Sequence, residues 1–357
     1  METNDLIRRQ FISIAICISA ILLLNGIFTV GGWLADLYFH RWYGFISTFF
    51  RKITGLVPVS IGDVIYITFI ILGIIFILKM LFNLVLGLWK PLLYRTLKGI
   101  AVLMWMYFAF LLLWGGHYRR HTLAVDLHLQ MERYTTADLY LLTDTLVKLT
   151  NRDKAMLEAS GLPELEREEM FRMASEGFQQ MADTLPVLRY RHPSVKSSLF
   201  GEYLNYIGVT GYMNPFTLEA QVNTTIPNFV QPFTTCHEIA HQVGYAPEEA
   251  ANFVGYIVAS NTGDSRFRYA ANFEMLLYSV RQLGRRSGYL ARQVWDKTDT
   301  GVREDVRRLA TFYRKYEGPI DDYSAVLYDQ YLKANRQEHG IRSYSEVVGW
   351  LMAYYKI

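Results

Sequence analysis

Three long apolar runs dominate the first third of the chain. Residues 11–30 and 99–116 contain no charged side chain, and residues 64–89 contain only Lys79, whose long stem can reach the membrane interface. A helix of about 20 apolar residues crosses the hydrocarbon layer of a bilayer, and three such runs are less typical of buried core helices. The pattern predicts a lipid-bilayer anchor at residues 1–118, with transmembrane helices at about 11–33, 62–89 and 98–116.

Two shorter patterns lie between the first two apolar runs. Residues 39–52 mix aromatic with basic side chains, which predicts an amphipathic helix lying along the membrane interface. Ser60 precedes Asp63 by three residues, at the start of the second run. This spacing predicts a capping box that begins the second transmembrane helix, rather than a buried functional acid.

From Arg119 onward the hydrophobic positions recur mainly at helical spacing. Leu139, Leu142, Leu146 and Leu149 form one stripe of a helix for which Thr136 is the predicted cap. Pro163 precedes an acidic first turn and predicts the start of a second helix. Further helices are predicted at residues 232–243, 247–259, 266–282, 302–316, 323–337 and 343–356.

Extended structure is predicted at residues 197–200 and 217–223, where β-forming and turn residues alternate. The second segment is either an edge strand, able to pair with an extended peptide, or an ordinary buried strand. Ser343 and Glu346 predict a capping box for the last helix. The chain is therefore expected to be mainly α, with three transmembrane helices followed by a mostly helical domain, residues 119–357, that contains a small β-sheet.

Charge divides the chain into two unequal parts. Up to Tyr118 there are nine Lys and Arg against four Asp and Glu, and the remainder has 27 against 29. This nearly neutral remainder lacks the concentrated basic face of a nucleic-acid-binding protein, so no nucleic-acid partner is expected. It also contains a single cysteine, Cys236, which excludes an internal disulfide there.

Basic residues flank both ends of the predicted transmembrane helices. Three crossings place the N-terminus and the C-terminal domain on opposite sides of the membrane. Basic flanks favour the cytoplasmic side, and the side of the N-terminus has six against five. This small excess predicts an exported C-terminal domain; the six are Arg8, Arg9, Lys79, Lys90, Arg95 and Lys98, and the five are Arg41, Arg51, Lys52, Arg119 and Arg120.

Residues 231–253 carry the strongest chemical signal. Pro232 suits the first turn of a helix, in which His237 and His241 are one turn apart and leave the same face. Glu238 follows the first histidine, as in the H-E-x-x-H arrangement of zinc metallopeptidases. In that arrangement two imidazoles bind Zn²⁺ and the glutamate is the general base. The competing interpretation is a pair of surface histidines on an ordinary amphipathic helix.

A catalytic zinc site needs a third protein ligand and an open position. Gly244 can adopt a left-handed conformation that ends the helix, and Pro247 then starts a new one. Glu248 is thereby placed near the metal, and Asn252, one turn later, is positioned to hydrogen-bond a ligand side chain. Glu249 is the rival ligand, but its direction is rotated by about 100° on a helix. We therefore predict that Glu248 completes the zinc site.

The same residues resemble known peptidase patterns. Glu248-Glu-Ala-Ala-Asn252 is similar to the third-ligand helix of gluzincin-type peptidases, Glu-x-x-Ala-Asp or Asn. Nearly end to end, the chain also resembles a family of uncharacterised bacterial integral-membrane proteins with zinc-peptidase-like character, although Ala250 stands where that family favours an acidic residue. Its hallmark segments are Val57-Pro-Val-Ser-Ile-Gly-Asp63, Asn214-Pro-Phe-Thr-Leu-Glu-Ala-Gln-Val-Asn223, residues 237–253, Tyr331-Leu-Lys-Ala-Asn335 and Gly340-Ile-Arg-Ser-Tyr344.

The resemblance implies a zincin-like fold, a bacterial inner-membrane location and hydrolysis of a peptide or protein substrate. In such an enzyme Glu238 takes a proton from a zinc-activated water, and a further donor stabilises the oxyanion. An alternative function is a zinc-stabilised, inactive membrane scaffold or sensor. The sequence leaves open the cleavage specificity, the oligomeric state and the oxyanion donor, for which the candidates are Tyr256, Tyr323, Arg342 and Tyr344.

Overall fold

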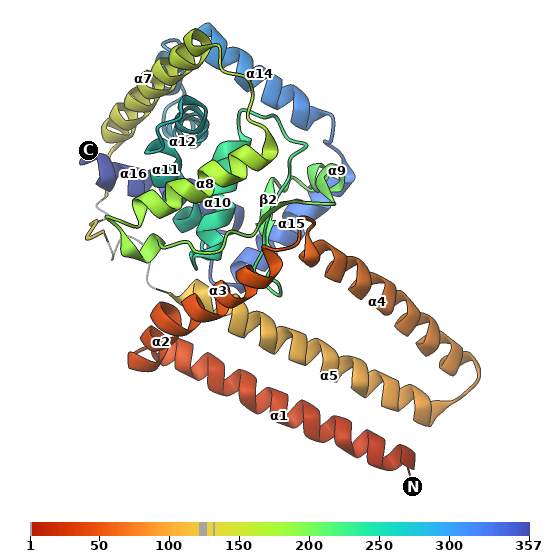
Figure 1. The fold of residues 1–357 in the computed structure, drawn as a ribbon. Coiled ribbons are helices and arrows are strands. Elements are labelled where there is room, and N and C mark those ends of the chain that lie inside the picture. The colour runs from red at the N-terminus through yellow and green to blue at the C-terminus, as the bar shows by residue number, and fades with distance from the viewer. Residues whose placement is uncertain (1, 121–126, 131–132) are drawn as a thin grey trace.

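The computed structural model describes residues 2–120, 127–130 and 133–357 (Figure 1). Three long helices extend from a globular part, a name we use for the described residues from 127 onward. These are α1 (Glu2–Val30), α4 (Ile61–Val85) and α5 (Trp89–Leu113). All three are long and apolar enough to cross a membrane, as the apolar runs predict.

The three long helices pack unequally. Helices α1 and α5 lie side by side, and the Trp105 indole donates a hydrogen bond to the Ser13 hydroxyl at 3.1 Å. Helix α4 diverges from α5 on the way from their shared turn to the globular part (Figure 1). No residue in the most apolar window of α4 is buried within the described structure. One of the three long apolar helices, α4, therefore diverges from the other two.

Helices α2 (Trp33–Leu37), η1 (Tyr38–Trp42) and α3 (Tyr43–Thr54) connect α1 to α4. The predicted amphipathic helix is present, but its polar face is turned toward the globular part. Arg51 is buried and donates to the carbonyls of Arg191 and Gln242, each at 3.2 Å. The Arg51 guanidinium is therefore bound to backbone carbonyls of the globular part, and its predicted place beside the membrane stays a prediction. The exposed face of α3 carries Phe45, Phe49 and Ile53.

Helices form most of the globular part, and α10 and α11 lie at its centre among the others (Figure 1). Of the predicted stripe, Leu139, Leu142 and Leu146 are fully buried in the core that surrounds them, and Leu149 is partly buried. The longer helices are α7 (Thr136–Ser160), α8 (Arg167–Met181), α10 (Gln231–Gln242), α11 (Glu248–Ser260), α12 (Ser265–Arg286), α13 (Gly288–Trp295), α14 (Thr300–Arg314), α15 (Pro319–Ala334) and α16 (Val347–Tyr355). The short ones are η2 (Gly115–Arg119), η3 (Pro186–Leu188), α9 (Gly201–Asn205) and η4 (Gly340–Glu346).

Several predicted helix ends differ from the structure. Thr135, not Thr136, caps α7, because its hydroxyl accepts from the Asp138 amide and the Asp138 carboxylate accepts from the Thr135 amide. Helix α8 begins at Arg167, four residues beyond Pro163. The capping box predicted at Ser343 is also wrong. The Ser343 hydroxyl instead donates to the Gly340 carbonyl at 2.6 Å inside η4, and α16 begins only at Val347.

A small mixed sheet has the strand order β1-β3-β2. Strand β1 (Val195–Ser197) pairs parallel with β3 (Ala220–Val222), and β2 (Gly211–Met213) pairs antiparallel with β3. The segment 217–223 therefore contains the central, fully buried strand β3, so the buried alternative is confirmed and the edge alternative is wrong. The outer strands are β1 and β2, because two hydrogen-bonded neighbours leave β3 no free side. The extended segment expected at 197–200 ends at Ser197.

The start of α4 is fastened to this sheet by buried polar side chains. The Glu219 carboxylate accepts from the amides of Ile61 at 3.2 Å and Gly62 at 2.6 Å, where the helix dipole favours negative charge. Ser60 caps the helix by accepting from the Asp63 amide at 3.0 Å. The Asp63 carboxylate does not complete a capping box, because it accepts from the Leu199 amide at 2.7 Å. We call this cluster, Ser60, Asp63, Glu219 and Gln221, the α4 joint.

The α4 joint brings together in space two of the hallmark segments, which are distant in sequence. Residues 57–63 supply the helix start, and residues 214–223 supply Glu219 and Gln221, whose amide donates to the Ser60 hydroxyl at 3.0 Å. Gly62 has to be glycine, because a Cβ there would lie 2.5 Å from the Asn214 amide nitrogen. The sequence motifs in these segments therefore connect a membrane helix to the sheet.

Candidate metal centre

Helices α10 and α11 and the turn between them bring the predicted ligands together. Pro232 lies in the first turn of α10, where its missing N–H leaves no hydrogen bond unmade. The helix ends at Gln242, and Gly244 adopts the predicted left-handed conformation, with φ of 100°. A side chain at this position would meet the Arg120 guanidinium at 2.5 Å. Pro247 then precedes Glu248, the first residue of α11.

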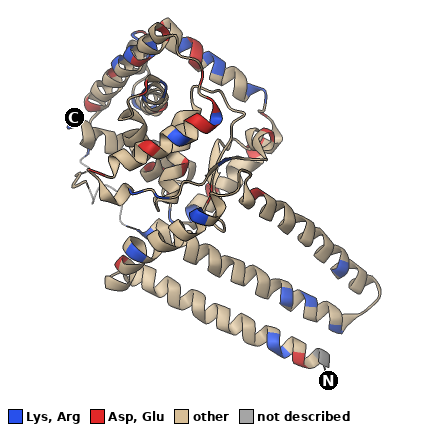
Figure 2. Ribbon diagram, in the orientation of Figure 1, with Lys and Arg blue, Asp and Glu red and all other residues tan. Residues whose placement is uncertain are grey.

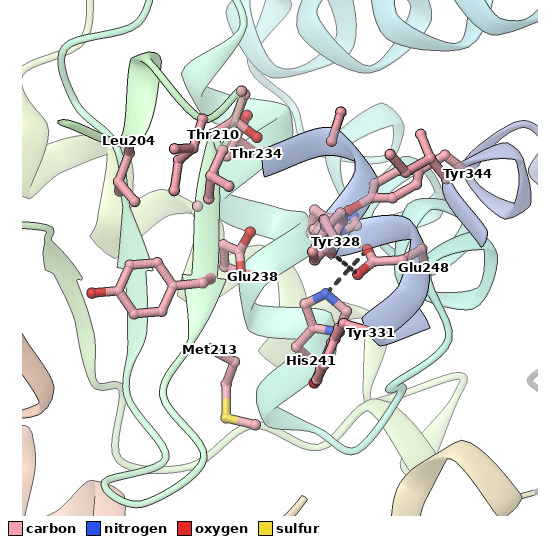
Figure 3. A pocket seen from close by; sticks show the side chains of 18 of the residues that line it. Leu204, Thr210, Met213, Thr234, Glu238, His241, Glu248, Tyr328, Tyr331 and Tyr344 are labelled. Carbon is pink, nitrogen blue, oxygen red and sulfur yellow. Dashed lines mark hydrogen bonds and ion pairs between the residues drawn. The ribbon is translucent and has the colours of Figure 1, made fainter. Parts of the chain in front are cut away.

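His237, His241 and Glu248 converge on one buried point. Glu248 Oε2 lies 3.2 Å from His237 Nε2 and 3.5 Å from His241 Nε2. The candidate ligand atoms of the three residues all lie within 4.8 Å of one another. Two ligands bound to tetrahedral zinc at its usual bond lengths are about 3.3 Å apart. The spacing therefore suits a single ion, and Figure 3 shows His241 and Glu248 pointing toward one another.

Neighbouring groups orient these side chains. His241 Nδ1 lies 2.7 Å from the Tyr245 carbonyl, so this nitrogen donates to the carbonyl and Nε2 faces Glu248. The Tyr328 hydroxyl donates to Glu248 Oε1 at 2.8 Å. Glu248 Oε2 is buried and faces only the two imidazole nitrogens among the described residues. Three potential ligand atoms thus face one another, an arrangement that could hold a metal ion.

Asn252 and Glu249, also on α11, differ in whether they face the candidate metal centre. Asn252 is buried beside the centre, and its amide donates to the Tyr344 carbonyl at 3.2 Å. It also lies close enough to His237 to oppose, in part, the lowering of that imidazole's pKa by burial. Glu249 points elsewhere and accepts from the Gln337 amide at 2.7 Å. Glu248, and not Glu249, therefore faces the two imidazoles.

Burial and charge act differently on the three acids of this region. Burial raises the pKa of Glu238 to about 8 and that of Glu249 to about 7. Burial would also raise the pKa of Glu248, but the neighbouring imidazoles hold it well below its usual range. Glu248 in turn raises the pKa of His241 to about 9 against the effect of burial. The carboxylate among the histidines thus stays ionised, as a metal ligand must be.

Glu238 lies between the candidate metal centre and the sheet. Its side chain faces β2 so closely that a Cβ on Gly211 would lie 2.6 Å from Glu238 Oε1. Its other oxygen, Oε2, is buried and has no hydrogen-bond partner among the described residues. Figure 3 shows Glu238 between Thr210 and the pair formed by His241 and Glu248. A proton acceptor therefore lies beside the metal-binding point with one oxygen unused.

A cavity of about 1450 Å³ contains both Glu238 and the candidate ligands. Of the four candidate oxyanion donors, only Tyr344 lines it. The Tyr256 hydroxyl is bonded to Asn272 inside the core, and Tyr323 is 75% exposed. Arg342 is exposed, and it does not line the cavity.

Sequence reasoning missed Tyr328 and Tyr331, which line the cavity on α15 (Figure 3). The helix itself was predicted from residues 323–337. The sequence does not show which face of this helix turns toward the candidate metal centre. That depends on how α15, about 90 residues from the ligands in sequence, packs against them. Both tyrosines become recognisable only after the fold has placed them.

The centre thus belongs to a recognisable class, in which two histidines one helical turn apart and a glutamate from the next helix can hold a metal ion. Over residues 38–352 the chain matches the family described as Protein of unknown function (DUF3810). This match covers most of the chain, and the protein therefore belongs to that family. No curated protein and no solved structure matches the chain.

Proposed function

We propose that the protein is a membrane-anchored zinc metallopeptidase that hydrolyses peptide bonds with Glu238 as the general base. The observation that carries the proposal is the convergence of His237, His241 and Glu248 on one point beside an unpartnered Glu238 oxygen. Two imidazoles and a carboxylate are a donor set typical of catalytic zinc. When bound there, zinc supplies Lewis acidity, which acidifies water and polarises a carbonyl group.

Glu238 has the position and the proton affinity of a general base. Burial raises its pKa to about 8, close to the range in which a base both accepts and returns a proton near neutral pH. Its free Oε2 accepts a proton from the attacking water and then gives it to the leaving amine. The neighbouring edge of β2 holds the substrate within reach, so no other proton carrier is required.

The open edge of β2 supports a peptide as the substrate. The Asn223 amide donates to the Thr210 carbonyl at 2.9 Å, and the Asn214 amide donates to the Glu219 carbonyl at 2.9 Å. Hydrogen-bonded pairs alternate along an antiparallel ladder, so the main-chain groups of Gly211 and Met213 point away from β3. An extended peptide pairs with such an edge through its own main chain. The scissile bond then lies over Glu238.

The proposal includes a location in the bacterial inner membrane, with residues 1–118 as anchor and residues 119–357 as an exported catalytic domain. Figure 2 shows Lys and Arg near the N-terminal end of α1 and toward the shared turn of α4 and α5. On the other side, Arg51 and Arg120 donate to backbone carbonyls of the globular part. Arg95 on the N-terminal side donates likewise to the Lys79 carbonyl, so the orientation is supported by the count alone, six basic residues against five.

The test is the Glu238→Gln substitution in the full-length protein. We expect cleavage of a mixed peptide library to fall by about 10²–10⁴-fold, because the proton acceptor is lost. Bound zinc, measured by elemental analysis, should remain near that of the wild type, because the three ligands are intact. Cleavage that survives this substitution would remove Glu238 as the base. A wild-type protein that binds zinc and cleaves no peptide would favour the alternative function, a zinc-stabilised and inactive membrane scaffold or sensor.

A further inference from the structure

The cavity that contains Glu238 has one wall made by a membrane helix. Tyr66, Phe69 and Ile70 of α4 line it, and their spacing of three and four residues puts them on one helix face. Phe69 and Ile70 are 39% and 59% exposed. The same cavity therefore reaches from the candidate metal centre to side chains of α4, a helix that is apolar enough to span a bilayer.

A second, smaller crevice continues this path between the long helices. It has a volume of about 490 Å³ and lies among α1, α4 and α5. Ile65 and Phe69 of α4 line one side, and Ala101, Val102 and Trp105 of α5 line another. Phe69 lines both cavities, and its ring lies 6.2 Å from the ring of Phe216 in the globular part. The crevice and the cavity that contains the candidate metal centre therefore meet at Phe69.

Helix α4 is positioned to receive another helix. The α4 joint holds the start of α4, so the first turns of this helix have a fixed position relative to β2 and Glu238. Its most apolar window is unburied in the described structure, although α1 and α5 pack together. Transmembrane helices associate through close side-chain packing where small residues such as Ala101 reduce bulk. A crevice of this kind suits an apolar helix better than a polar peptide in water.

We propose that the substrates are membrane-spanning proteins, whose transmembrane helix docks against α4 and whose adjoining chain leaves the bilayer beside Phe69. This inference rests on the proposed peptidase function. The chain that emerges there meets the free edge of β2 and then Glu238, so the bond hydrolysed lies just outside the membrane. Cleavage adds one water across that peptide bond and gives one fragment with a new carboxyl terminus and one with a new amino terminus. The fragment that carries the transmembrane helix stays anchored, and the other is released.

The first experiment compares three probes that share one cleavable sequence. One is soluble, one carries a helix of about 20 apolar residues, and one carries a myristoyl chain. With full-length protein in liposomes, we expect kcat/KM for the helix-anchored probe to exceed that for the soluble probe at least about tenfold, because docking of the helix on α4 holds the cleavable segment near Glu238. An equal gain with the myristoyl probe would overturn docking of a helix. No gain with the helix would overturn the inference and leave the peptidase proposal standing.

Two phenylalanines of α4 give a matched pair of variants. Phe69→Ala is expected to lower the ratio of helix-anchored to soluble cleavage severalfold, since Phe69 lines both cavities. Phe82→Ala should leave this ratio unchanged, since Phe82 is exposed farther along the same helix and lines neither cavity. Equal ratios in the two variants would contradict docking at the proposed face.

Crosslinking tests the docking without catalysis. A photo-crosslinking phenylalanine analogue replaces Phe69, or Phe82 as the control, in the full-length Glu238→Gln protein. The probe is an apolar helix of about 20 residues with a mixed peptide tail, in the same liposomes. Position 69 is expected to capture the probe severalfold more than position 82. Equal capture overturns the inference even where wild-type protein cleaves nothing, so the two proposals fail separately.

Discussion

The α4 joint and the candidate metal centre are both buried polar clusters at the start of a helix, but their carboxylates are used differently. In the joint, Glu219 and Asp63 accept hydrogen bonds from the amides of Ile61, Gly62 and Leu199. In the metal centre, Glu248 Oε2 faces two imidazole nitrogens and accepts no hydrogen bond from the described residues. A buried carboxylate needs compensation, which the backbone supplies in the first cluster and the neighbouring imidazoles, or a metal ion bound among them, would supply in the second.

This difference separates a structural cluster from a ligand-binding one. Asp63 and Glu248 cannot be distinguished from the sequence alone, because both lie in the first turn of a helix. The distinction comes from the partners that the fold brings to each carboxylate. Backbone amide groups satisfy the two carboxylates of the joint, whereas the Glu248 carboxylate faces two imidazoles that could share a metal ion with it. Three substitutions test how far the comparison holds.

The largest effect is expected from replacing the carboxylate among the histidines. Glu248→Ala should reduce bound zinc from about one ion per chain to less than about a tenth, because two imidazoles supply only half of a tetrahedral site. Glu249→Ala is the matched control at the next position, and should keep its zinc because Glu249 bonds to Gln337 instead. Elemental analysis of both purified proteins measures this. Loss of zinc only in Glu249→Ala would reverse the assignment.

A smaller effect is expected at the joint, on stability instead of metal. Glu219→Ala leaves the buried amides at the start of α4 without acceptors, which costs about 2–3 kcal/mol. Thermal unfolding in detergent should show a lower midpoint, with zinc content unchanged. Glu304→Ala, at an exposed position on α14, should unfold like the wild type. If Glu219→Ala also emptied the metal site, the two clusters would not be independent.

The smallest effect is expected from the tyrosine that holds the Glu248 carboxylate. Tyr328→Phe removes the hydroxyl that donates to Glu248 Oε1, and zinc affinity should fall by about tenfold. Tyr323→Phe on the same helix should bind zinc normally, because Tyr323 is largely exposed. Competition with a chromophoric chelator gives both affinities. Equal affinities in the two variants would show that Tyr328 does not orient the ligand.

Local patterns were sufficient for the parts of the molecule that depend on neighbouring residues. The three apolar runs predicted the long helices, and the Gly244 bend predicted how Glu248 returns to His237 and His241. Both follow from short-range rules, namely the length needed to cross a bilayer and the left-handed conformation open to glycine. The geometry of the candidate ligands could therefore be anticipated from one continuous segment of the chain.

Features that depend on distant packing could not be anticipated in the same way. Which strand lies at the sheet edge is decided by pairing between segments far apart, so the sequence left residues 217–223 open between an edge and a buried strand and did not predict β2. Ser343 fits a capping rule, yet its hydroxyl is used within η4. Nothing in the sequence near Arg51 indicates that its guanidinium donates to the Gln242 carbonyl at the end of α10. In each case the partner is decided by the fold.

The contact between α3 and α10 has a practical consequence for handling the protein. The Gln242 carbonyl, at the end of the motif helix, accepts from Tyr43, Ser47 and Arg51, all of which belong to α3. The adjoining apolar cluster likewise joins residues of the N-terminal segment to Met213 and Leu218. A water-soluble fragment lacking the first 118 residues would strip these supports from the helix that bears both histidines. Purification should therefore retain the whole chain in a lipid or detergent environment.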